Sequence, residues 1–330
     1  MLRILHLADL HLGYRSPNLY GSTEPEPRDT LLEAIAAYLN PQNAPAGSGA
    51  GKTDLLLIAG DLFDSHNPEA ALVRRTMNTI KRIQDLGLAV ITVPGNHDEL
   101  SYRDSVYRRY EKEWPGLLVS TPRMEAPMPY AVQGKRIFLV SMAYDARYPT
   151  ANELQSYFPK RSSEALHICL LHGALWDETS PPVNQRTLLL HREALLESGY
   201  DYIALGHLHQ PLELQGDNPG CLLAYPGMIL QRHAHDPHAG KLLWVEIERG
   251  LAPKREWLPC PLPGLEATPT SEEALTDAAI LALSQEDTIP GALARCYLRD
   301  LVSTNSTVRR KYLLSSLTTA IDAYNANTVS

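Results

Sequence analysis

Five short motifs of acidic, amide and imidazole side chains are spread over the first 210 residues of the chain. They read DLH at residues 9–11, GDLFD at 60–64, GNHDE at 95–99, LHG at 171–173 and GHLH at 206–209. This mixture of carboxylate, amide and imidazole groups suits Mn, Fe or Zn better than Ca or Mg. A centre of two divalent ions held ~3.5–4 Å apart needs about this number and variety of ligands. The motifs therefore predict a centre of two divalent metal ions.

Seven side chains in these motifs are the candidate ligands. Asp61 is central enough to touch both ions and bridge them. One shell is completed by Asp9, His11 and His209, and the other by Asn96, His172 and His207. The D-x-H and H-x-H spacings suit this arrangement, because residues i and i+2 can point at one site where the backbone turns just after a strand. Each motif alone is also compatible with an ordinary polar turn, but five in this order make coincidence a poor explanation.

Each motif follows a segment that is predicted to be a buried strand. These apolar runs cover residues 2–8, 54–59, 88–93, 165–171 and 200–205. Helical periodicity at 28–39 and 69–86, the latter with basic residues on one face, separates the first three runs. Alternating strands and helices indicate parallel pairing with helices on the sheet faces. Ligands then bind beyond the carboxyl ends of the strands, where the motifs would meet.

Looser patterns continue along the chain. They predict helices at 101–114 and 188–198 and strands at 136–142, 221–225 and 241–247, so that two sheets are plausible. Residues 254–273 are rich in proline and are typical of a linker or an edge segment. The segment AGSGAGKT at 46–53 matches a relaxed phosphate-binding loop, but its strand follows the glycines instead of preceding them. It is therefore predicted to be a surface loop.

Charge and cysteine usage limit the class of protein. Thirty Lys and Arg residues against 38 Asp and Glu give a net charge of −8, which excludes binding to nucleic acid by bulk charge but leaves a local basic groove open. The four cysteines form no CxxC pair, which fits a reducing cytosol. No apolar run approaches the ~18 residues of a membrane span. A cytoplasmic location without membrane contact is predicted.

In their order, the five motifs resemble the signature of the calcineurin-like metallophosphoesterases. More narrowly, ILHLADLHLG, GDLFDSHNPE and the later YPGMILQRHAHDPHAGKLLWVEI are similar to segments of the SbcD-type (Mre-like) DNA-repair nucleases. The resemblance implies an α/β fold in four layers, α-β-β-α, with two mixed sheets face to face. It also implies two divalent ions, with Mn²⁺ expected, and hydrolysis of phosphodiester bonds in DNA, with exonuclease action expected.

Carried onto this chain, the resemblance assigns roles to further residues. His97 would stabilise or protonate the leaving oxygen, and Asp98 would orient its ring. In some relatives a second histidine follows the GDLF stretch, whereas here Asp64 stands there and His66 comes two positions later. His66 either fills that role or faces solvent. Arg232 lies in the segment that resembles the family's RH pair and would contact a phosphate.

Residues 101–114 interleave basic and aromatic side chains, including Arg108 and Arg109. This stretch would bind DNA through phosphate contacts and base stacking, pack its aromatic side chains inward, or pair two copies into a homodimer. The resemblance also implies an SbcC-like coiled-coil ATPase as partner. The predicted domains are a catalytic domain at 1–250 and a small C-terminal α/β cap at 251–330. A small-molecule phosphodiesterase or phosphatase, acting for instance on a cyclic nucleotide, and a non-catalytic scaffold remain alternatives. The intact ligands argue against the scaffold.

Overall fold

The computed structural model describes residues 1–16, 26–123, 127–147, 165–176, 187–216, 220–232 and 240–262. The chain divides into two compact units, Met1–Ala267 and Thr268–Ser330, and all the described residues belong to the first. Residues 263–330, which make up most of the predicted C-terminal α/β cap, lie outside the described residues.

Six of the described strands form a first mixed sheet in the order β14-β13-β1-β2-β3-β4. Their bounds are β1 Leu2–Leu7, β2 Leu55–Ala59, β3 Ala89–Val93, β4 Leu117–Leu118, β13 Lys241–Ile247 and β14 Lys254–Pro259. Strands β1 to β4 pair in parallel, whereas β13 and β14 pair antiparallel at the other side. The motifs that follow β1, β2 and β3 therefore meet at one edge of this sheet.

Six further strands form a second mixed sheet in the order β11-β12-β10-β7-β6-β5. Their bounds are β5 Met128–Val132, β6 Lys135–Ser141, β7 Leu166–His172, β10 Tyr202–Gly206, β11 Leu212–Gln215 and β12 Leu222–Tyr225. The central strands β6, β7, β10 and β12 are parallel. Strands β8 (Ala174–Trp176) and β9 (Leu189–His191) form a separate parallel pair.

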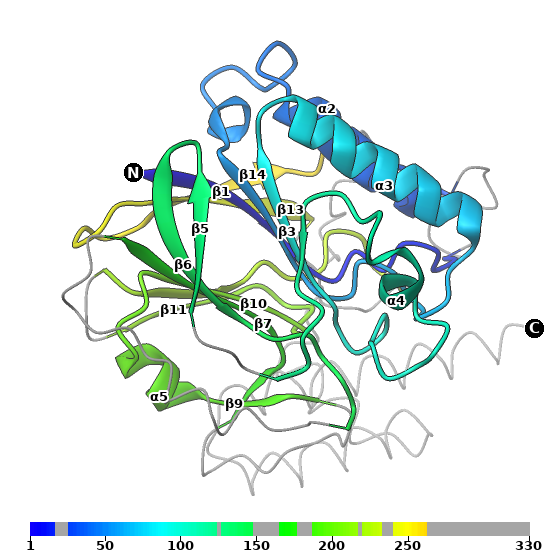
Figure 1. The fold of residues 1–330 in the computed structure, drawn as a ribbon. Coiled ribbons are helices and arrows are strands. Elements are labelled where there is room, and N and C mark those ends of the chain that lie inside the picture. Colours follow the sequence, from blue (N-terminus) through cyan, green and yellow to red (C-terminus); the bar gives the residue numbers. More distant parts are fainter. Residues whose placement is uncertain are drawn as a thin grey trace, which may run out of the picture. The chain divides into compact units, whose positions relative to one another are not determined.

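The two sheets are stacked between helices in four layers, as the family resemblance implied (Figure 1). Helices α2 (Pro27–Leu39) and α3 (Ala70–Asp85) cover the outer face of the first sheet, and α5 (Arg192–Glu197) lies on the outer side of the second. Successive side chains of each strand point to opposite faces of the sheet and so enter two different hydrophobic cores. Leu5 and Leu56 pack towards the helices, whereas Ile4 and Leu57 pack between the sheets. The predicted α/β fold class is confirmed.

A buried histidine links the two sheets. His6 on β1 is fully buried, and its Nδ1 lies 2.8 Å from the hydroxyl of Tyr202 on β10. Burial lowers the pKa of His6 to about 3, so the ring is neutral inside the core. This contact satisfies a polar group that would otherwise be costly in the apolar layer.

Two predicted helices differ from the structure. Only Val106–Tyr110 within 101–114 is helical (α4), because the flanking turns place Trp114 in the core and Tyr102 against His66. The start of the helix predicted at 188–198 is instead strand β9, which pairs with β8, so tertiary pairing overrides helical propensity there. Strand β14 is the edge strand of the first sheet, so residues 254–259, predicted as part of a linker or an edge segment, belong to the first unit.

The glycine-rich segment 46–53 is a loop that ends in a short 3₁₀ turn, η1 (Ala50–Lys52), and leads into β2. The backbone N–H of Gly49 donates to a carboxylate oxygen of Glu256 on β14. Because no helix starts after these glycines, they lack the geometry that cradles phosphates. The prediction of a surface loop is confirmed.

Candidate metal and catalytic site

The seven candidate ligands meet where five strands end. Motifs from β1, β2 and β3 of the first sheet face motifs from β7 and β10 of the second. Backbone contacts hold the first two motifs together, since the N–H of Asp9 donates to the Gly60 carbonyl and that of His11 to the Asp61 carbonyl. The distances are 3.1 and 2.9 Å. Residues about fifty positions apart in the chain are thus fixed side by side.

Unusual backbone conformations mark this place. Asp9, His11, Asp61 and His207 have φ values of 55°, 49°, 49° and 102°. They are four of the five non-glycine residues with positive φ in the described part of the chain. Such conformations cost roughly 1–3 kcal/mol each and persist only where surrounding structure holds them, typically at functional sites. Here they turn the side chains towards one another directly after their strands.

One group of donor atoms is formed by Asp9, His11 and His209, which offer ligand atoms within 4.8 Å of one another. The Nε2 atoms of His11 and His209 face each other at 3.3 Å. Asp9 is held by the backbone N–H of His207, which donates to both carboxylate oxygens at 3.2 and 3.1 Å. This is the first of the two predicted ligand sets.

The second predicted set surrounds the amide of Asn96. Its Oδ1 lies 2.9 Å from Nε2 of His172 and 3.0 Å from Nδ1 of His207. The opposite ring nitrogens have partners of their own, because Nδ1 of His172 lies 2.8 Å from the Ala59 carbonyl and Nε2 of His207 lies 3.3 Å from the hydroxyl of Thr187. Metal-binding histidines are commonly oriented in this way, which leaves one nitrogen of each ring for the ion.

Asp61 lies between the two sets. Its Oδ2 is 3.5 Å from Nε2 of His172 and 3.8 Å from Nε2 of His11, one residue from each set. Glycines make room for this arrangement. A Cβ on Gly95 would come within 2.2 Å of Oδ1 of Asp61, and one on Gly60, whose φ is 84°, within 2.2 Å of Nδ1 of His172. Both motifs therefore need glycine for steric reasons.

Burial and neighbouring charges together set the protonation of the site. It raises the pKa of Asp9 to about 7, with the neighbouring Asp61 charge adding to the effect. Burial also acts to raise the pKa of Asp61, but the adjacent His172, with His11 and His97, outweighs it and holds that pKa well below its usual range. Burial acts to lower the pKa of His172, but the Asp61 carboxylate outweighs this and raises it to about 9.

Burial lowers the pKa of His207 to about 4 and that of His209 to about 3, so both imidazoles are neutral and able to act as ligands. The two buried carboxylates Asp9 and Asp61 repel one another, which is why the charge of Asp61 adds to the raised pKa of Asp9. Carboxylate, imidazole and amide donors that converge in this way fit divalent metal ions by number, chemistry and placement.

His97 lies beside these groups without belonging to either set. Its backbone N–H donates to Oδ1 of Asp61 at 2.8 Å, and its side chain is 31% exposed. Its Nδ1 lies 3.1 Å from the Asp64 carbonyl and 3.6 Å from Oδ1 of Asp64. The imidazole can therefore reach a substrate while Asp64 fixes one of its nitrogens.

The predicted role of Asp98 in orienting His97 is wrong. Asp98 is fully buried, and its carboxylate accepts the backbone N–H of Gly95 at 2.7 Å and that of Phe63 at 3.1 Å. It also accepts the hydroxyl of Tyr107 at 2.8 Å. Asp98 thus ties the GDLFD and GNHDE loops together, while Asp64 contacts His97.

Asp64 has a wider role than the sequence analysis gave it. Its Oδ1 lies 3.1 Å from Nδ1 of His11 and 3.2 Å from Nη2 of Arg232. The guanidinium of Arg232 lies over the ring of Tyr14, 4.5 Å from its centroid. In the sequence, Asp64 is distinguished only by standing where some relatives have histidine. The signal in the sequence for a role at the site was that Asp64 belongs to the GDLFD motif, three residues after Asp61.

Arg28 is a further residue that the sequence analysis missed. It is fully buried, and its guanidinium donates to the carbonyls of Leu10 and Leu230 at 3.1 and 2.9 Å and to that of Gln231. These bonds connect the DLH loop to the segment that carries Arg232. Helical periodicity gave no hint of this, because Arg28 begins the helix and its partners come from distant loops.

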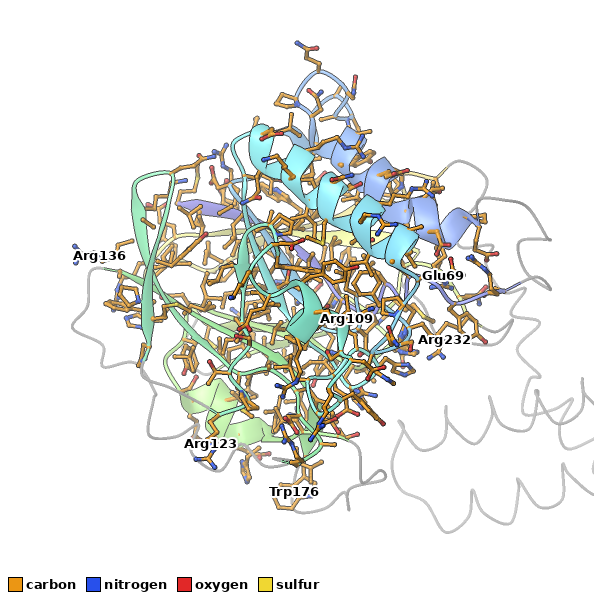
Figure 2. All side chains as sticks on the ribbon, turned by 45° about the vertical axis from the view of Figure 1, so that its right-hand side comes forward. Glu69, Arg109, Arg123, Arg136, Trp176 and Arg232 are labelled. Carbon is orange, nitrogen blue, oxygen red and sulfur yellow. The ribbon has the colours of Figure 1, made fainter. Side chains whose placement is uncertain are left out.

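The predicted DNA contacts occupy different positions. Arg232 lies at the site, whereas Arg109 is on α4 (Figure 2). Both Arg109 and its neighbour Arg108 are exposed. Nε of Arg108 donates to the Leu100 carbonyl, and Arg109 lies over the ring of Tyr110. His66 neither joins the ligand sets nor simply faces solvent, because its ring stacks on Tyr102 at the rim of a depression beside His97. Roles of these four residues towards substrate stay predictions.

Comparison with known proteins agrees with this geometry. Residues 2–211 match the family model described as calcineurin-like phosphoesterase. The chain belongs to this family. Over 254 residues it is 30% identical to the uncharacterized metallophosphoesterase YhaO of Bacillus subtilis (strain 168), which corresponds to 76% of this chain and 58% of YhaO. The chain thus spans somewhat over half the length of that curated relative.

Two solved structures from Thermus thermophilus are similar. The protein TT1561 matches with a TM-score of 0.43 at 11% identity, covering 78% of this chain and 97% of that one. A 5′-nucleotidase precursor matches with a TM-score of 0.42 at 15% identity, covering 78% of this chain and 54% of that one.

The chain thus combines membership of the calcineurin-like phosphoesterase family with a cluster of donor groups that could hold divalent metal ions. In the part of the chain that the structure describes, no helix combines the length and apolar character needed to cross a bilayer.

Proposed function

We propose that this metallophosphoesterase is a DNA nuclease of the SbcD type that uses two metal ions, with Mn²⁺ as the expected metal, and removes nucleotides from DNA ends. The convergence of five strand ends on Asp61 carries the hydrolytic part of the proposal. The SbcD-like segments around the DLH and GDLFD motifs and at 225–247 support DNA as the substrate.

The chain's own residues have separable roles. Asp9, His11 and His209 would hold one ion, Asn96, His172 and His207 the other, and Asp61 both. When bound, the ions lower the pKa of water and neutralise phosphate oxygens. Nε2 of His97 would donate a proton to the leaving oxygen, while Nδ1 faces Asp64. Arg232, which contacts Asp64 and the ring of Tyr14, would bind a non-bridging phosphate oxygen.

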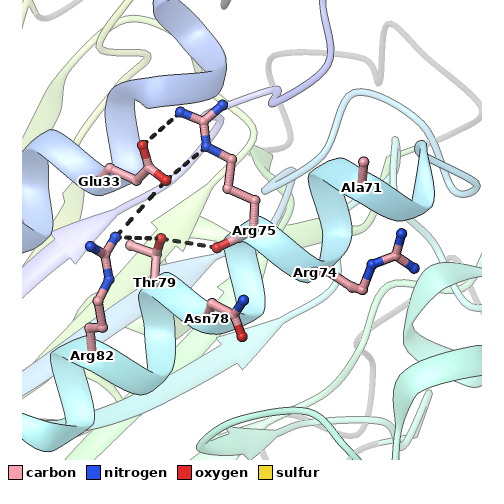
Figure 3. A pocket seen from close by; sticks show the side chains of 7 residues that line it. All are labelled: Glu33, Ala71, Arg74, Arg75, Asn78, Thr79 and Arg82. Atoms are coloured by element: carbon pink, nitrogen blue, oxygen red, sulfur yellow. Dashed lines mark hydrogen bonds and ion pairs between the residues drawn. The ribbon is translucent and has the colours of Figure 1, made fainter.

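Local positive charge outside the site supports a polyanionic substrate. A groove of about 580 Å³ on the outer side of α2 and α3 is lined by Arg74, Arg75 and Arg82 together with the single acid Glu33 (Figure 3). Glu33 accepts two 2.7 Å hydrogen bonds from Arg75 and lies 4.0 Å from Arg82, and the side chains of Arg74 and Arg82 are exposed. In a chain of net charge −8, this concentration of cations is available for DNA phosphates.

The test is to incubate the purified full chain with Mn²⁺ and end-labelled single- and double-stranded DNA, beside bis(4-nitrophenyl) phosphate. We expect the ester to be hydrolysed and DNA to be shortened from its ends. The His97→Ala variant serves as the control for contaminating nucleases. Cleavage of the ester without any cleavage of DNA would overturn the DNA assignment.

The second candidate is a phosphodiesterase for a small molecule such as a cyclic nucleotide. It is favoured by a depression of about 210 Å³ beside His97, which is large enough for one nucleoside. A cyclic nucleotide in the same assay decides between the two. An SbcC-like ATPase partner and a homodimer stay proposals, which co-purification and light scattering of the full chain test.

A further inference from the structure

The depression beside His97 has an aromatic wall. The rings of His66 and Tyr102 lie parallel, with centroids 3.8 Å apart and an angle of 13° between their planes. Both rings border the same depression as Asn96 and His97. Tyr102 is among the large apolar residues that stay exposed, at 36%. This aromatic wall therefore borders the same depression as the imidazole of His97.

Local contacts fix the aromatic wall in place. The carbonyl of His66 accepts the backbone N–H of Val106 at 2.7 Å, which joins the loop after β2 to the start of α4. Nε2 of His66 lies 3.7 Å from Oδ1 of Asp104, and the amide of Asn67 donates to Oδ2 of the same carboxylate at 2.8 Å. Two loops that carry Tyr102 and His66 are therefore bound to each other independently of any ligand, so little freedom is lost on binding.

The charge of the lining decides which part of a substrate fits. Asp64 and Glu99 contribute carboxylates to the depression, and none of the described residues that line it is a lysine or an arginine. The negative charge of these carboxylates disfavours a phosphate group in the depression. Arg232 contacts Oδ1 of Asp64 but does not line the depression. A planar uncharged group is favoured, because it can stack on an aromatic ring without opposing charge.

We propose that Tyr102, supported by His66, is a stacking platform for the base of the nucleotide next to the scissile phosphate. The proposal rests on the proposed nuclease function and deepens it by assigning substrate specificity to Tyr102. A nucleobase stacks on aromatic side chains whatever its sequence, so the platform would favour nucleotide esters over simple phosphodiesters while leaving base sequence unread.

The test compares two diesters that share one leaving group, thymidine 5′-(4-nitrophenyl phosphate) and methyl 4-nitrophenyl phosphate, in the full chain with Mn²⁺. Tyr102→Ala is expected to raise KM for the thymidine ester roughly tenfold, which is the usual worth of one stacked base, with a smaller change in kcat. KM for the methyl ester should stay as in the wild type. Tyr102→Phe keeps the ring and should restore the wild-type KM. Equal effects on both esters, or none on the thymidine ester, would overturn the platform.

A binding measurement separates this proposal from the nuclease function. Fluorescence anisotropy in EDTA compares a labelled trinucleotide with the same molecule lacking one base, in the wild type and in Tyr102→Ala. The platform predicts weaker binding of the abasic molecule by the wild type only. If DNA is not cleaved but this difference appears, the nuclease function fails and the platform stands. If DNA is cleaved but this difference is absent, the nuclease function stands and the platform fails.

Discussion

The donor cluster between the sheets and the arginine groove on α2 and α3 are built in opposite ways. The cluster is buried, comes from five distant segments and holds four residues at positive φ. The groove is exposed and takes three of its four charged residues from two and a half turns of one helix. Charges that must share a cation need long-range packing to hold them together, whereas charges that attract a polyanion need only lie on one face.

The largest expected effect breaks the cluster at its centre. Asp61→Ala removes the carboxylate that lies between both donor sets, so metal affinity should fall by more than the roughly 10–100-fold typical of residues outside the ligand shell. Elemental analysis after gel filtration measures bound metal, and turnover of bis(4-nitrophenyl) phosphate should disappear with it. Wild-type metal content in this variant would remove Asp61 from the centre.

His97→Ala tests whether chemistry and metal binding are separable within the cluster. The contact from His97 to Asp61 is made by the backbone N–H, which the substitution keeps. Metal content should therefore stay as in the wild type, while turnover falls by about 10²–10⁴ as expected for a lost general acid. Steady-state kinetics on the small ester gives the answer, and full activity would refute the role of the imidazole.

The pH dependence of metal binding at the donor cluster should differ from that of DNA binding at the arginine groove. In the metal-free protein His172 stays protonated up to its raised pKa of about 9, and Asp9 takes up a proton below about 7. A metal ion must displace these protons, so the affinity of the cluster for Mn²⁺ should increase with pH. The increase should be up to about tenfold per pH unit for each competing proton. DNA binding by the arginines should be flat over the same interval, because guanidinium groups keep their charge. Calorimetric titration of Mn²⁺ between pH 6 and 9 tests the first part, and a flat profile contradicts it.

The smallest expected effect concerns the groove. The double variant Arg74→Glu, Arg82→Glu should weaken DNA binding several-fold and lower the salt dependence by about two phosphate contacts, with hydrolysis of the small ester unchanged. Arg123→Glu, Arg136→Glu makes the same charge change at two exposed positions away from the groove (Figure 2). Equal losses in both double variants would show that overall charge, and not the groove, attracts DNA.

Local sequence patterns predicted most of the elements that carry the site. Apolar runs located β1, β2, β3, β7 and β10 within two residues of their observed bounds, because buried parallel strands read as continuous apolar segments. The structure brings all seven predicted ligands together at the ends of those strands. Their assignment to two metal ions stays a prediction.

Neighbours across the fold were not predictable in the same way. Asp98 was expected at His97 because it is adjacent in sequence, yet it binds two loop amides and Tyr107, and Asp64 takes its place. The stacking of His66 on Tyr102 was not predictable from the sequence either, nor were the hydrogen bonds from Arg28 to the carbonyls of distant loops. In each case the partner is chosen by the packing of separate loops.

By itself, the sequence determined which strand ends carry metal-binding chemistry, because residue type and hydrophobic period are local properties of the chain. Only the tertiary structure decided which side chain faces which. Side-chain direction after a strand depends on backbone angles such as the positive φ of Asp9 and Asp61, and these are held by contacts with residues far away in the chain.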